Sequence, residues 1–335
     1  MRQYAALILL LAGGCSGAAA IASPDGGDPG KGDRPPTSFP KGSEDAGTRK
    51  PFPIVLAHGL DGFKNIGPLE YYYGVPEALT QDGHDVFVAQ VDAYNSSEVR
   101  GAQLQTFVQS VLQQTGAEKV NLICHSQGSL DCRYVASNLG PHVGAVVMIA
   151  GPNRGDVVAD VATQALPGPA QDAVGALLSL FGGFIDGGAD NQDAKAAIQA
   201  LSSAGADAFT VAHPDDPRVA YYSVAGRSNG ARGDQDCGTA TPVPFISRYD
   251  SYVSTLNPLL AAPAGIINGS FSPAPTNDGL VTVASAKWGT FLGCLPADHL
   301  SEIGQIGGQA PDPGNPFDHV LFYRQLANWL VERGY

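Results

Sequence analysis

Short runs of consecutive apolar residues alternate along this chain with longer segments in which apolar residues recur at helical spacing. The runs predict buried strands at 53–57, 85–90, 120–124, 143–150, 218–225 and 280–284. The helical spacing predicts helices at 69–81, 99–114, 127–138 and 316–332, the second of them behind a capping-box-like start at 95–98. Strands that alternate with helices favour the α/β class, with a mostly parallel sheet covered by helices on both faces.

A long insertion interrupts this alternation between residues 152 and 217. It is rich in Ala and Gly and contains apolar helical pieces at 157–165, 173–184 and 194–201. Because it follows the C-terminal end of a strand, it lies where ligands enter sheets of this class. We expect a helical lid over a binding site, with a simple capping subdomain as the alternative.

The first 22 residues have the pattern of an export signal peptide. Arg2 supplies the positive start, an apolar core covers 4–12, and small residues follow. That core is too short to span a bilayer. Segment 11–15 resembles a bacterial lipobox and predicts an acylated Cys15 that attaches the protein to a membrane, with ordinary cleavage after 18–20 as the alternative. We therefore expect an exported protein, either an outer-membrane lipoprotein or a secreted one.

Composition separates a linker from the folded part of the chain. Residues 23–50 are rich in Gly, Pro, Asp, Ser and Lys and contain almost no large apolar residues, so they predict a disordered linker ahead of a domain at 51–335. The whole chain has a net charge of -13, and only 15% of its residues are charged. Without a basic surplus to neutralise phosphates, a nucleic-acid partner is excluded.

The segment VNLICHSQGSLDCRYVA, residues 120–136, places Ser126 between an apolar strand and a helix. A strand-turn-helix of the form G-x-S-x-G presents a nucleophilic serine, and it requires small residues two positions before and after that serine. Gly128 meets the second requirement. Cys124 replaces the usual first glycine and is small enough to meet the other. The pattern predicts that Ser126 is a nucleophile.

A nucleophilic serine needs a base and an acid that orients the base, and in this fold they follow in the order serine, acid, histidine. His299 lies in an irregular loop and is the predicted base. His319 falls in the final helix, where we interpret it as a solvated helix residue. Asp278, just before an apolar run, is the predicted acid; a simple turn-forming role is its alternative, and Asp298 is its rival.

Two backbone N–H groups are needed to stabilise the oxyanion of an acyl-transfer reaction. The first is predicted at Gln127, directly after the nucleophile. The second is predicted at Leu60, because the glycines of the segment LAHGLDGF (56–63) permit a tight turn after the first strand. His58 in this segment is expected to have a structural hydrogen-bonding role.

Several motifs together resemble a known family. They are PIVLAHGLDGFKNI (53–66), SSEVRGAQL (96–104), KVNLICHSQG (119–128), RYVA (133–136), YYSVAG (221–226), NDGLV (277–281) and HLSEIGQ (299–305). In this order they resemble the secreted bacterial triacylglycerol lipases of the Pseudomonas–Burkholderia–Proteus group, which have the α/β-hydrolase fold. The resemblance spans about 52–335. It implies a catalytic triad of Ser126, Asp278 and His299, an oxyanion hole from the N–H groups of Leu60 and Gln127, and chemistry without a cofactor.

The resemblance also implies a structural calcium ion beside the loop of the catalytic histidine. The family has a calcium-binding aspartate two residues after that histidine, and this position is Ser301 here. Gln305 matches a backbone ligand of the family, and the second carboxylate would lie within 249–262. Because calcium prefers several oxygen ligands that include carboxylates, the sequence leaves calcium binding open. Without the ion, the loop of His299 needs another brace.

Four cysteines besides Cys15 allow three pairings in an oxidising compartment. Some members of the family have a disulfide whose position implies a bond between Cys237 and Cys294, and this bond would brace the loop of His299. Cys124 and Cys132 lie at similar depth below the predicted turn, so a second disulfide is geometrically possible, with two small buried thiols as the alternative. A catalytic redox pair is not expected, because their spacing is not C-x-x-C.

Together these features predict an extracytoplasmic serine hydrolase that cleaves carboxylic esters. We expect a triacylglycerol lipase that forms an acyl-enzyme on Ser126 and acts on lipid at an oil–water interface. A polyhydroxyalkanoate depolymerase or a short-chain carboxylesterase is the alternative on the same fold, and a non-catalytic surface lipoprotein is the alternative from another class. The sequence makes no prediction about a folding chaperone or an oligomeric state.

Overall fold

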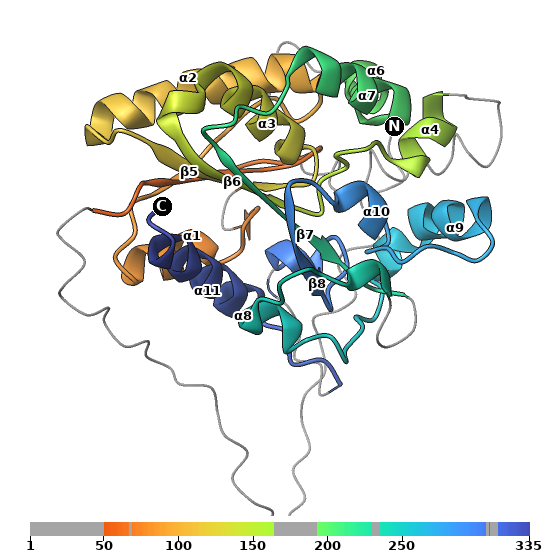
Figure 1. The fold of residues 1–335 in the computed structure, drawn as a ribbon. Coiled ribbons are helices and arrows are strands. Elements are labelled where there is room, and N and C mark those ends of the chain that lie inside the picture. Colours follow the sequence, from red (N-terminus) through yellow and green to blue (C-terminus); the bar gives the residue numbers. More distant parts are fainter. Residues whose placement is uncertain (1–49, 67–68, 164–192, 230–234, 306–307, 309–313) are drawn as a thin grey trace, which may run out of the picture. The chain divides into compact units, whose positions relative to one another are not determined.

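The computed structural model describes residues 50–66, 69–163, 193–229, 235–305, 308 and 314–335 (Figure 1). The predicted signal peptide, Cys15, the linker apart from Lys50, and the predicted helix 173–184 lie outside these residues. Residues Lys50–Tyr335 form one compact unit. Within the described ranges, no helix is long and apolar enough to cross a membrane.

In the described part of the chain, six strands form one parallel sheet in the order β4-β1-β5-β6-β7-β8 (Figure 1). The strands are β1 (Ile54–Ala57), β4 (Val86–Val88), β5 (Val120–His125), β6 (Val143–Ile149), β7 (Ala220–Gly226) and β8 (Thr290–Leu295). A small antiparallel pair is made by β2 (Asn65–Ile66) and β3 (Leu69–Glu70). The predicted class, a mostly parallel sheet, is confirmed.

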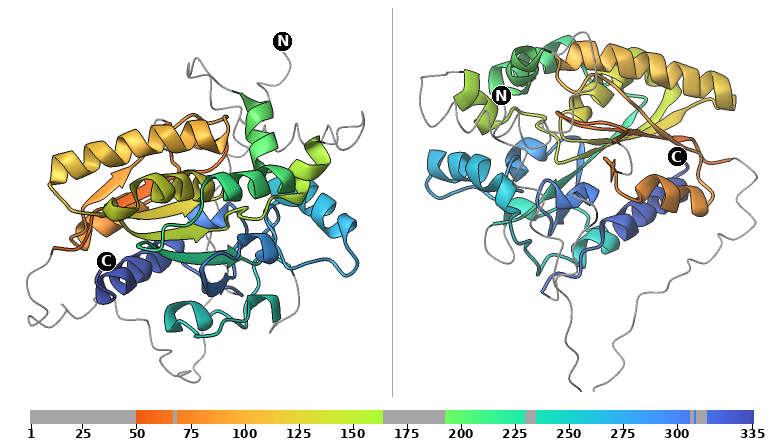
Figure 2. Two further views of the ribbon diagram at one scale, coloured as in Figure 1. Left: turned by 45° about the horizontal axis from the view of Figure 1, so that its top comes forward. Right: turned by 180° about the vertical axis from the view of Figure 1, so that it is seen from behind.

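Both faces of the sheet are buried, because successive side chains of a strand point to opposite sides. On one face, Ile54 and Ile123 pack into a cluster with α1 (Val75–Gln81) and α11 (His319–Glu332). On the other face, Val55 packs into a cluster with α2 (Ser97–Thr115) and α3 (Gly128–Leu139). The views in Figures 1 and 2 agree that the two helix pairs lie on opposite sides of the sheet.

Smaller elements complete the described structure around this sheet. From the segment 152–217 come α4 (Val157–Thr163), α6 (Ala194–Leu201) and α7 (Ser203–Ala212), which pack on one another. Later in the chain follow η2 (Gln235–Cys237), α8 (Pro244–Ser247), η3 (Pro258–Leu260), α9 (Ala261–Ser270), α10 (Val283–Ala286) and η4 (Ser301–Ile303), and η1 (Gly140–His142) precedes β6. Helix α9 packs against α4 through Ile267 and Val158, at the right of Figure 1.

Local chemistry explains where the helices begin. The hydroxyl of Ser96 accepts a hydrogen bond from the N–H of Val99 and caps α2, which ends at Gly116 with a left-handed φ of 65°. The helix predicted at 69–81 is shorter than expected. It begins only at Val75, because Leu69–Glu70 pairs as β3 and Gly74 adopts a left-handed φ of 69°.

The prediction of a strand at 280–284 is wrong. There the side chain of Thr282 caps the short helix α10, and Asn277 and Thr282 form only an isolated bridge. The sixth strand is instead β8, which the sequence pattern missed because Gly293 interrupts its apolar run. A short apolar run alone does not distinguish a strand from a buried helical turn.

Candidate active site

Ser126 occupies the sharp turn between β5 and α3. Its φ of 55° lies in the left-handed region, which a non-glycine residue adopts only where its surroundings hold it. The N–H of Ser126 donates to the carbonyl of Ile149 at 3.0 Å, and the N–H of Ser129 donates to the carbonyl of Ser126 at 2.9 Å. A Cβ at Gly128 would lie 2.6 Å from the carbonyl oxygen of Ala57, so the residue two positions after the serine must be glycine.

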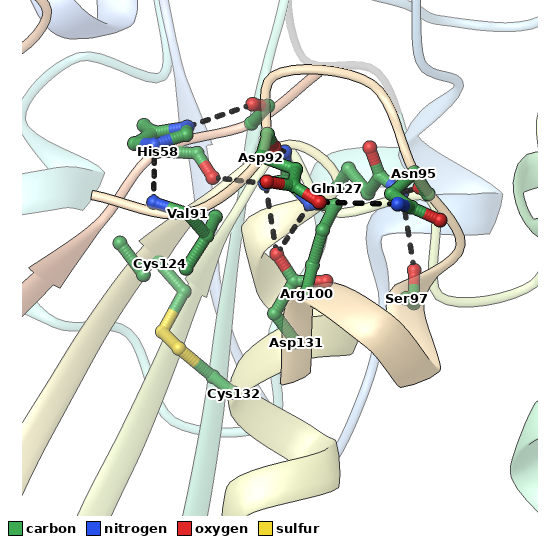
Figure 3. A network of polar contacts seen from close by, with 12 residues as sticks. His58, Val91, Asp92, Asn95, Ser97, Arg100, Cys124, Gln127, Asp131 and Cys132 are labelled. Atoms are coloured by element: carbon green, nitrogen blue, oxygen red, sulfur yellow. Dashed lines mark hydrogen bonds and ion pairs between the residues drawn. A yellow bond between two sulfur atoms is a disulfide. The ribbon is translucent and has the colours of Figure 1, made fainter. Parts of the chain in front are cut away.

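A disulfide joins Cys124 to Cys132 and thereby ties β5 to α3 on the two sides of Ser126 (Figure 3). Their Cα atoms are 6.5 Å apart, and both side chains are fully buried. This finding decides between the two alternatives for these cysteines, and the alternative of two separate buried thiols is wrong. Cys124 therefore replaces the usual glycine and also anchors the turn.

His299 and Asp278 form a buried pair. The Nδ1 of His299 donates to the Oδ2 of Asp278 at 2.8 Å, and the backbone N–H of His299 donates to the carbonyl of Asp278 at 2.9 Å. The other oxygen of Asp278, Oδ1, accepts from the N–H groups of Leu280 at 2.8 Å and Val281 at 2.6 Å. These contacts hold the carboxylate and the imidazole in one orientation.

The rival acid, Asp298, faces away from this pair. It accepts hydrogen bonds from the backbone N–H groups of Ser301 at 2.8 Å and Asn257 at 2.6 Å. The structure therefore brings Asp278, and not Asp298, to the imidazole of His299. Adjacent side chains diverge in this loop, as the sequence interpretation assumed.

His125, the residue directly before Ser126, connects the turn to His299. The rings of His125 and His299 have their centroids 4.6 Å apart. The Nε2 of His125 lies 3.0 Å from a carboxylate oxygen of Glu302, and its Nδ1 lies 2.8 Å from the hydroxyl of Tyr71. Burial, and then the nearby His299, holds the pKa of His125 well below its usual value, whereas burial raises the pKa of Glu302 well above its own.

This series of hydrogen bonds between Tyr71, His125 and Glu302 was not predicted from the sequence. The hydroxyl of Tyr71 also accepts a hydrogen bond from the N–H of Gly59 at 3.0 Å, so the series extends to the loop after β1. His125 and Glu302 are 177 positions apart, and only the fold brings them together. The one available signal was that both lie inside motifs that also contain a predicted catalytic residue.

The loop after β1 lies directly against the serine. A Cβ at Gly59 would lie 2.6 Å from the Cβ of Ser126 and 3.1 Å from its Oγ, so this backbone approaches the serine more closely than any other residue type would permit.

Hydrogen bonds hold this loop in place. The N–H of Gly62 donates to the carbonyl of Gly59 at 3.2 Å, and the N–H of Asp61 donates to the carbonyl of Ala93 at 2.9 Å. Leu60 and Gln127, the predicted oxyanion donors, thus belong to two segments that meet at Ser126.

A buried polar network supports that loop (Figure 3). The guanidinium of Arg100, on α2, donates to the carbonyl of His58 at 2.8 Å and to the carboxylate of Asp131 at 2.9 Å, and Arg100 is fully buried. Burial raises the pKa of Asp131 to about 6, although Arg100 opposes this shift. The side-chain amide of Gln127 donates to the carbonyl of Asn95 at 2.9 Å. Arg100 was not predicted from the sequence.

His58 has the expected structural role. Its Nδ1 donates to the carbonyl of Gly59 at 3.0 Å, and its Nε2 accepts from the N–H of Val91 at 3.3 Å. Burial, together with the charge of Arg100, lowers the pKa of His58 to about 3. The imidazole is therefore neutral at physiological pH and presents one donor and one acceptor to these two backbone groups.

The prediction that His319 is a solvated helix residue is wrong. Only 5% of its surface is exposed, and its Nε2 donates to the carbonyl of Tyr73 at 2.8 Å. A Cβ at Gly304 would lie 2.2 Å from this Nε2, so the ring packs against the loop that contains His299. Helical periodicity placed His319 near the start of α11 but gave no information about the loop that covers it.

The loop of His299 has further attachments. Cys237 and Cys294 are bonded, with Cα atoms 5.4 Å apart, which confirms the predicted disulfide. The side-chain amide of Gln305 donates to the carbonyl of Tyr71 at 2.9 Å. These contacts fix the loop at the end of β8 and again after η4.

The residues near Ser301 do not fit the calcium site that the resemblance implies. Ser301 offers no carboxylate, and both oxygens of Asp298 already accept backbone N–H groups. Among the described residues, the acidic and histidine side chains close enough to hold a metal are His125, His299 and Glu302, which belong to the site itself. A hard cation such as calcium prefers a set of oxygen ligands, and this cluster offers two imidazoles and one carboxylate.

Comparison with known proteins agrees with this architecture. Residues 53–202 match the family model of the alpha/beta hydrolase fold. The chain is 36% identical over 304 residues to a triacylglycerol lipase of Vibrio cholerae, with 87% of this chain and 91% of the relative covered. It is 31% identical to a triacylglycerol lipase of Pseudomonas fragi, with 84% and 97% covered. The chain belongs to the bacterial triacylglycerol lipase family of α/β hydrolases.

Solved structures show the same fold. EstA from Clostridium botulinum superposes with a TM-score of 0.58 at 17% identity, with 88% of this chain and 92% of that chain covered. A mature lipase from Bacillus licheniformis superposes with a TM-score of 0.54 at 20% identity, with 76% and 86% covered. At these identities the likeness concerns the arrangement of the sheet and helices.

Proposed function

We propose that this member of the lipase family hydrolyses acylglycerols through an acyl-enzyme on Ser126. The observation that carries the proposal is the buried His299–Asp278 pair, in which Nδ1 of the imidazole faces the carboxylate at 2.8 Å. With a proton on Nδ1, the Nε2 of His299 is the basic nitrogen. The ring lies beside His125, whose next residue is the strained Ser126.

In the proposed mechanism, the Nε2 of His299 takes the hydroxyl proton as the Oγ of Ser126 attacks the ester carbonyl. The N–H groups of Leu60 and Gln127 stabilise the oxyanion of the tetrahedral intermediate. As the carbonyl re-forms, the imidazolium gives its proton to the departing alcohol, and the acyl group stays on Ser126. Water then attacks with the same base, releases the fatty acid and restores the serine.

The segment that precedes the acid in the sequence supports a lipid substrate. Residues 251–277, which lead up to Asp278, contain no charged side chain, and Tyr252, Leu259 and Phe271 in this segment are exposed. Exposed apolar side chains in a segment without charges suit contact with an oil–water interface. We also propose that the segment 152–217, including α4, α6 and α7, acts as the lid over this site.

We propose that the protein is exported, either secreted or attached to the outer membrane through an acylated Cys15. The two disulfides of the described chain support this proposal, because disulfides persist mainly outside the cytoplasm. Metabolic labelling with a fatty-acid probe, compared between the wild type and Cys15→Ala, tests the attachment. Equal labelling of the two proteins would exclude acylation at Cys15.

A covalent phosphonate probe and a series of p-nitrophenyl esters from acetyl to oleoyl test the function. We expect the phosphonate to label Ser126, Ser126→Ala to lose both labelling and hydrolysis, and the long-chain esters to be hydrolysed. Ser110→Ala, which changes an exposed serine of α2, is the matched control and should keep both. No labelling of the wild type would indicate a non-catalytic scaffold, and activity confined to short esters would indicate a carboxylesterase.

A further inference from the structure

Asp298 is a buried carboxylate next to His299 that takes no part in the His299–Asp278 pair. Only 1% of its surface is exposed. Its Oδ1 accepts from the N–H groups of Ser301 at 2.8 Å and Leu300 at 3.2 Å, and its Oδ2 accepts from the N–H of Asn257 at 2.6 Å. One carboxylate therefore closes the turn that follows His299 and also joins that turn to a segment about forty residues earlier in the chain.

The segment that donates this hydrogen bond also packs against the turn that contains Asp278. Asn257 caps η3, and the neighbouring side chains of Leu256 and Leu260 pack directly against Gly279. A Cβ at Gly279 would lie 2.4 Å from Leu256 and 3.1 Å from Leu260. Gly279 follows Asp278 and has a φ of 97°. The segment 256–260 is thus in contact with the turn of Asp278 on one side and with the loop of His299 on the other.

We propose that Asp298 is a positioning residue that holds His299 opposite Asp278. It does so by joining the loop of His299 to the segment 256–260, which packs against the turn of Asp278. The proposal rests on the catalytic role proposed above for His299. The same carboxylate needs no metal ion for this, because three backbone N–H groups bond directly to its two oxygens. Ser301, the residue at the family's calcium aspartate position, is one of these donors.

The other attachments of the loop act further from the imidazole. The Cys237–Cys294 disulfide fixes β8, five residues before His299, and Gln305 fixes the loop six residues after it. Glu302 contacts His125. Asp298 is the described side chain that hydrogen-bonds both to the residues after His299 and to the segment 256–260.

A matched pair of variants at Asn257 isolates the proposed bond. Asn257 has a φ of -60°, which proline adopts without strain, so Asn257→Pro removes the N–H that Asp298 accepts. Asn257→Ala keeps this N–H and removes only the side chain that caps Leu259. We expect Asn257→Pro and Asp298→Ala each to lower kcat by about tenfold or more with KM nearly unchanged, and Asn257→Ala to keep most of the activity.

The double variant Asp298→Ala with Asn257→Pro tests whether the two residues act together. We expect it to be no slower than Asp298→Ala alone, because Asp298→Ala already removes the bond that Asn257→Pro breaks. Hydrogen exchange at the N–H groups of Ser301 and Leu300 should become faster in Asp298→Ala, whether or not the protein is an esterase. Equal kcat in Asn257→Pro and Asn257→Ala would overturn the proposal, even if Asp298→Ala does not fold.

The inference that Asp298 acts without a metal ion has its own test. The wild-type protein is stripped with EGTA, and calcium chloride is then titrated while the heat of binding and the thermal unfolding midpoint are recorded. We expect no heat of binding and no change in the midpoint. A calcium-dependent rise of the midpoint would overturn this part. Failure of the phosphonate to label the wild type would instead contradict the proposed function, and these two results cannot be confused.

Discussion

The guanidinium of Arg100 donates to the backbone carbonyl of His58 at 2.8 Å, from a fully buried position at the start of α2. His58 immediately precedes Gly59, whose backbone faces Ser126. The bond therefore orients the peptide that leads to the predicted oxyanion donor at Leu60. The positive charge is balanced by Asp131 on α3, so two helices and the loop after β1 meet at one side chain (Figure 3).

Arg100→Met should be strongly destabilising. It leaves the carboxylate of Asp131 buried without its partner, and breaking a buried ion pair in this way costs about 3–5 kcal/mol of unfolding free energy. Urea denaturation measures this loss. The double variant Arg100→Met with Asp131→Leu should recover part of it, because no uncompensated charge remains. A single variant that loses less than about 1 kcal/mol would show that the pair contributes little.

Gly59→Ala should abolish esterase activity while the protein still folds. The added methyl group would lie 2.6 Å from the Cβ of Ser126, so either the serine or the loop has to move. Gly265→Ala on α9 is the control, because a Cβ there meets nothing within 4 Å. Hydrolysis rates and circular dichroism of both variants measure the effect. Full activity in Gly59→Ala would mean that the loop is not part of the site.

The two disulfides should be reduced in a fixed order. Cys237 is 9% exposed, whereas Cys124 and Cys132 are fully buried. A reductant therefore reaches the Cys237–Cys294 bond first. The Cys124–Cys132 bond beside Ser126 should persist until the domain unfolds. Stepwise reduction followed by alkylation and mass mapping gives the order. Alkylation of Cys124 before Cys237 in the folded protein would contradict the prediction.

Acidification should destabilise the fold through His58. Its pKa is about 3 in the folded protein, below the ordinary value of 6.5 that applies to the unfolded chain. Between these values the unfolded chain binds the proton and the folded protein does not, so this contribution to stability is full above pH 6.5 and is lost as the pH falls toward 3.

The variant His58→Gln isolates this effect, because glutamine does not titrate. The difference in unfolding free energy between wild type and His58→Gln should decrease steadily as the pH is lowered through that range, as measured by urea denaturation at several pH values. Asp131, with its raised pKa of about 6, acts in the opposite direction and is common to both proteins, so it cancels in the difference. A difference independent of pH would show that His58 titrates normally.

The sequence was most informative where a local motif constrains the backbone. The turn around Ser126 could be predicted because the motif requires small residues at fixed positions, and the left-handed φ of the serine agrees with it. The pairing of Asp278 with His299 followed from the order of residues in this fold, and the contact is confirmed. The catalytic roles of the three residues stay predictions until the phosphonate experiment is done.

The residues that support the site could not be predicted in the same way. Arg100 and Glu302 are charged side chains that sequence patterns assign to a solvated surface, yet both are fully buried. Their partners lie 42 and 177 positions away. No periodicity records such distant contacts. The same holds for His319, whose burial depends on a loop from another part of the chain.

The contact of His319 with Gly304 has a consequence for how the protein is made. The ring belongs to α11, which is synthesised after every other element of the described fold. Until that helix exists, the loop of His299 lacks one of the surfaces against which it closes. A growing chain therefore contains every strand of the described sheet and the turn of Ser126 before it contains the helix that closes the loop of its base.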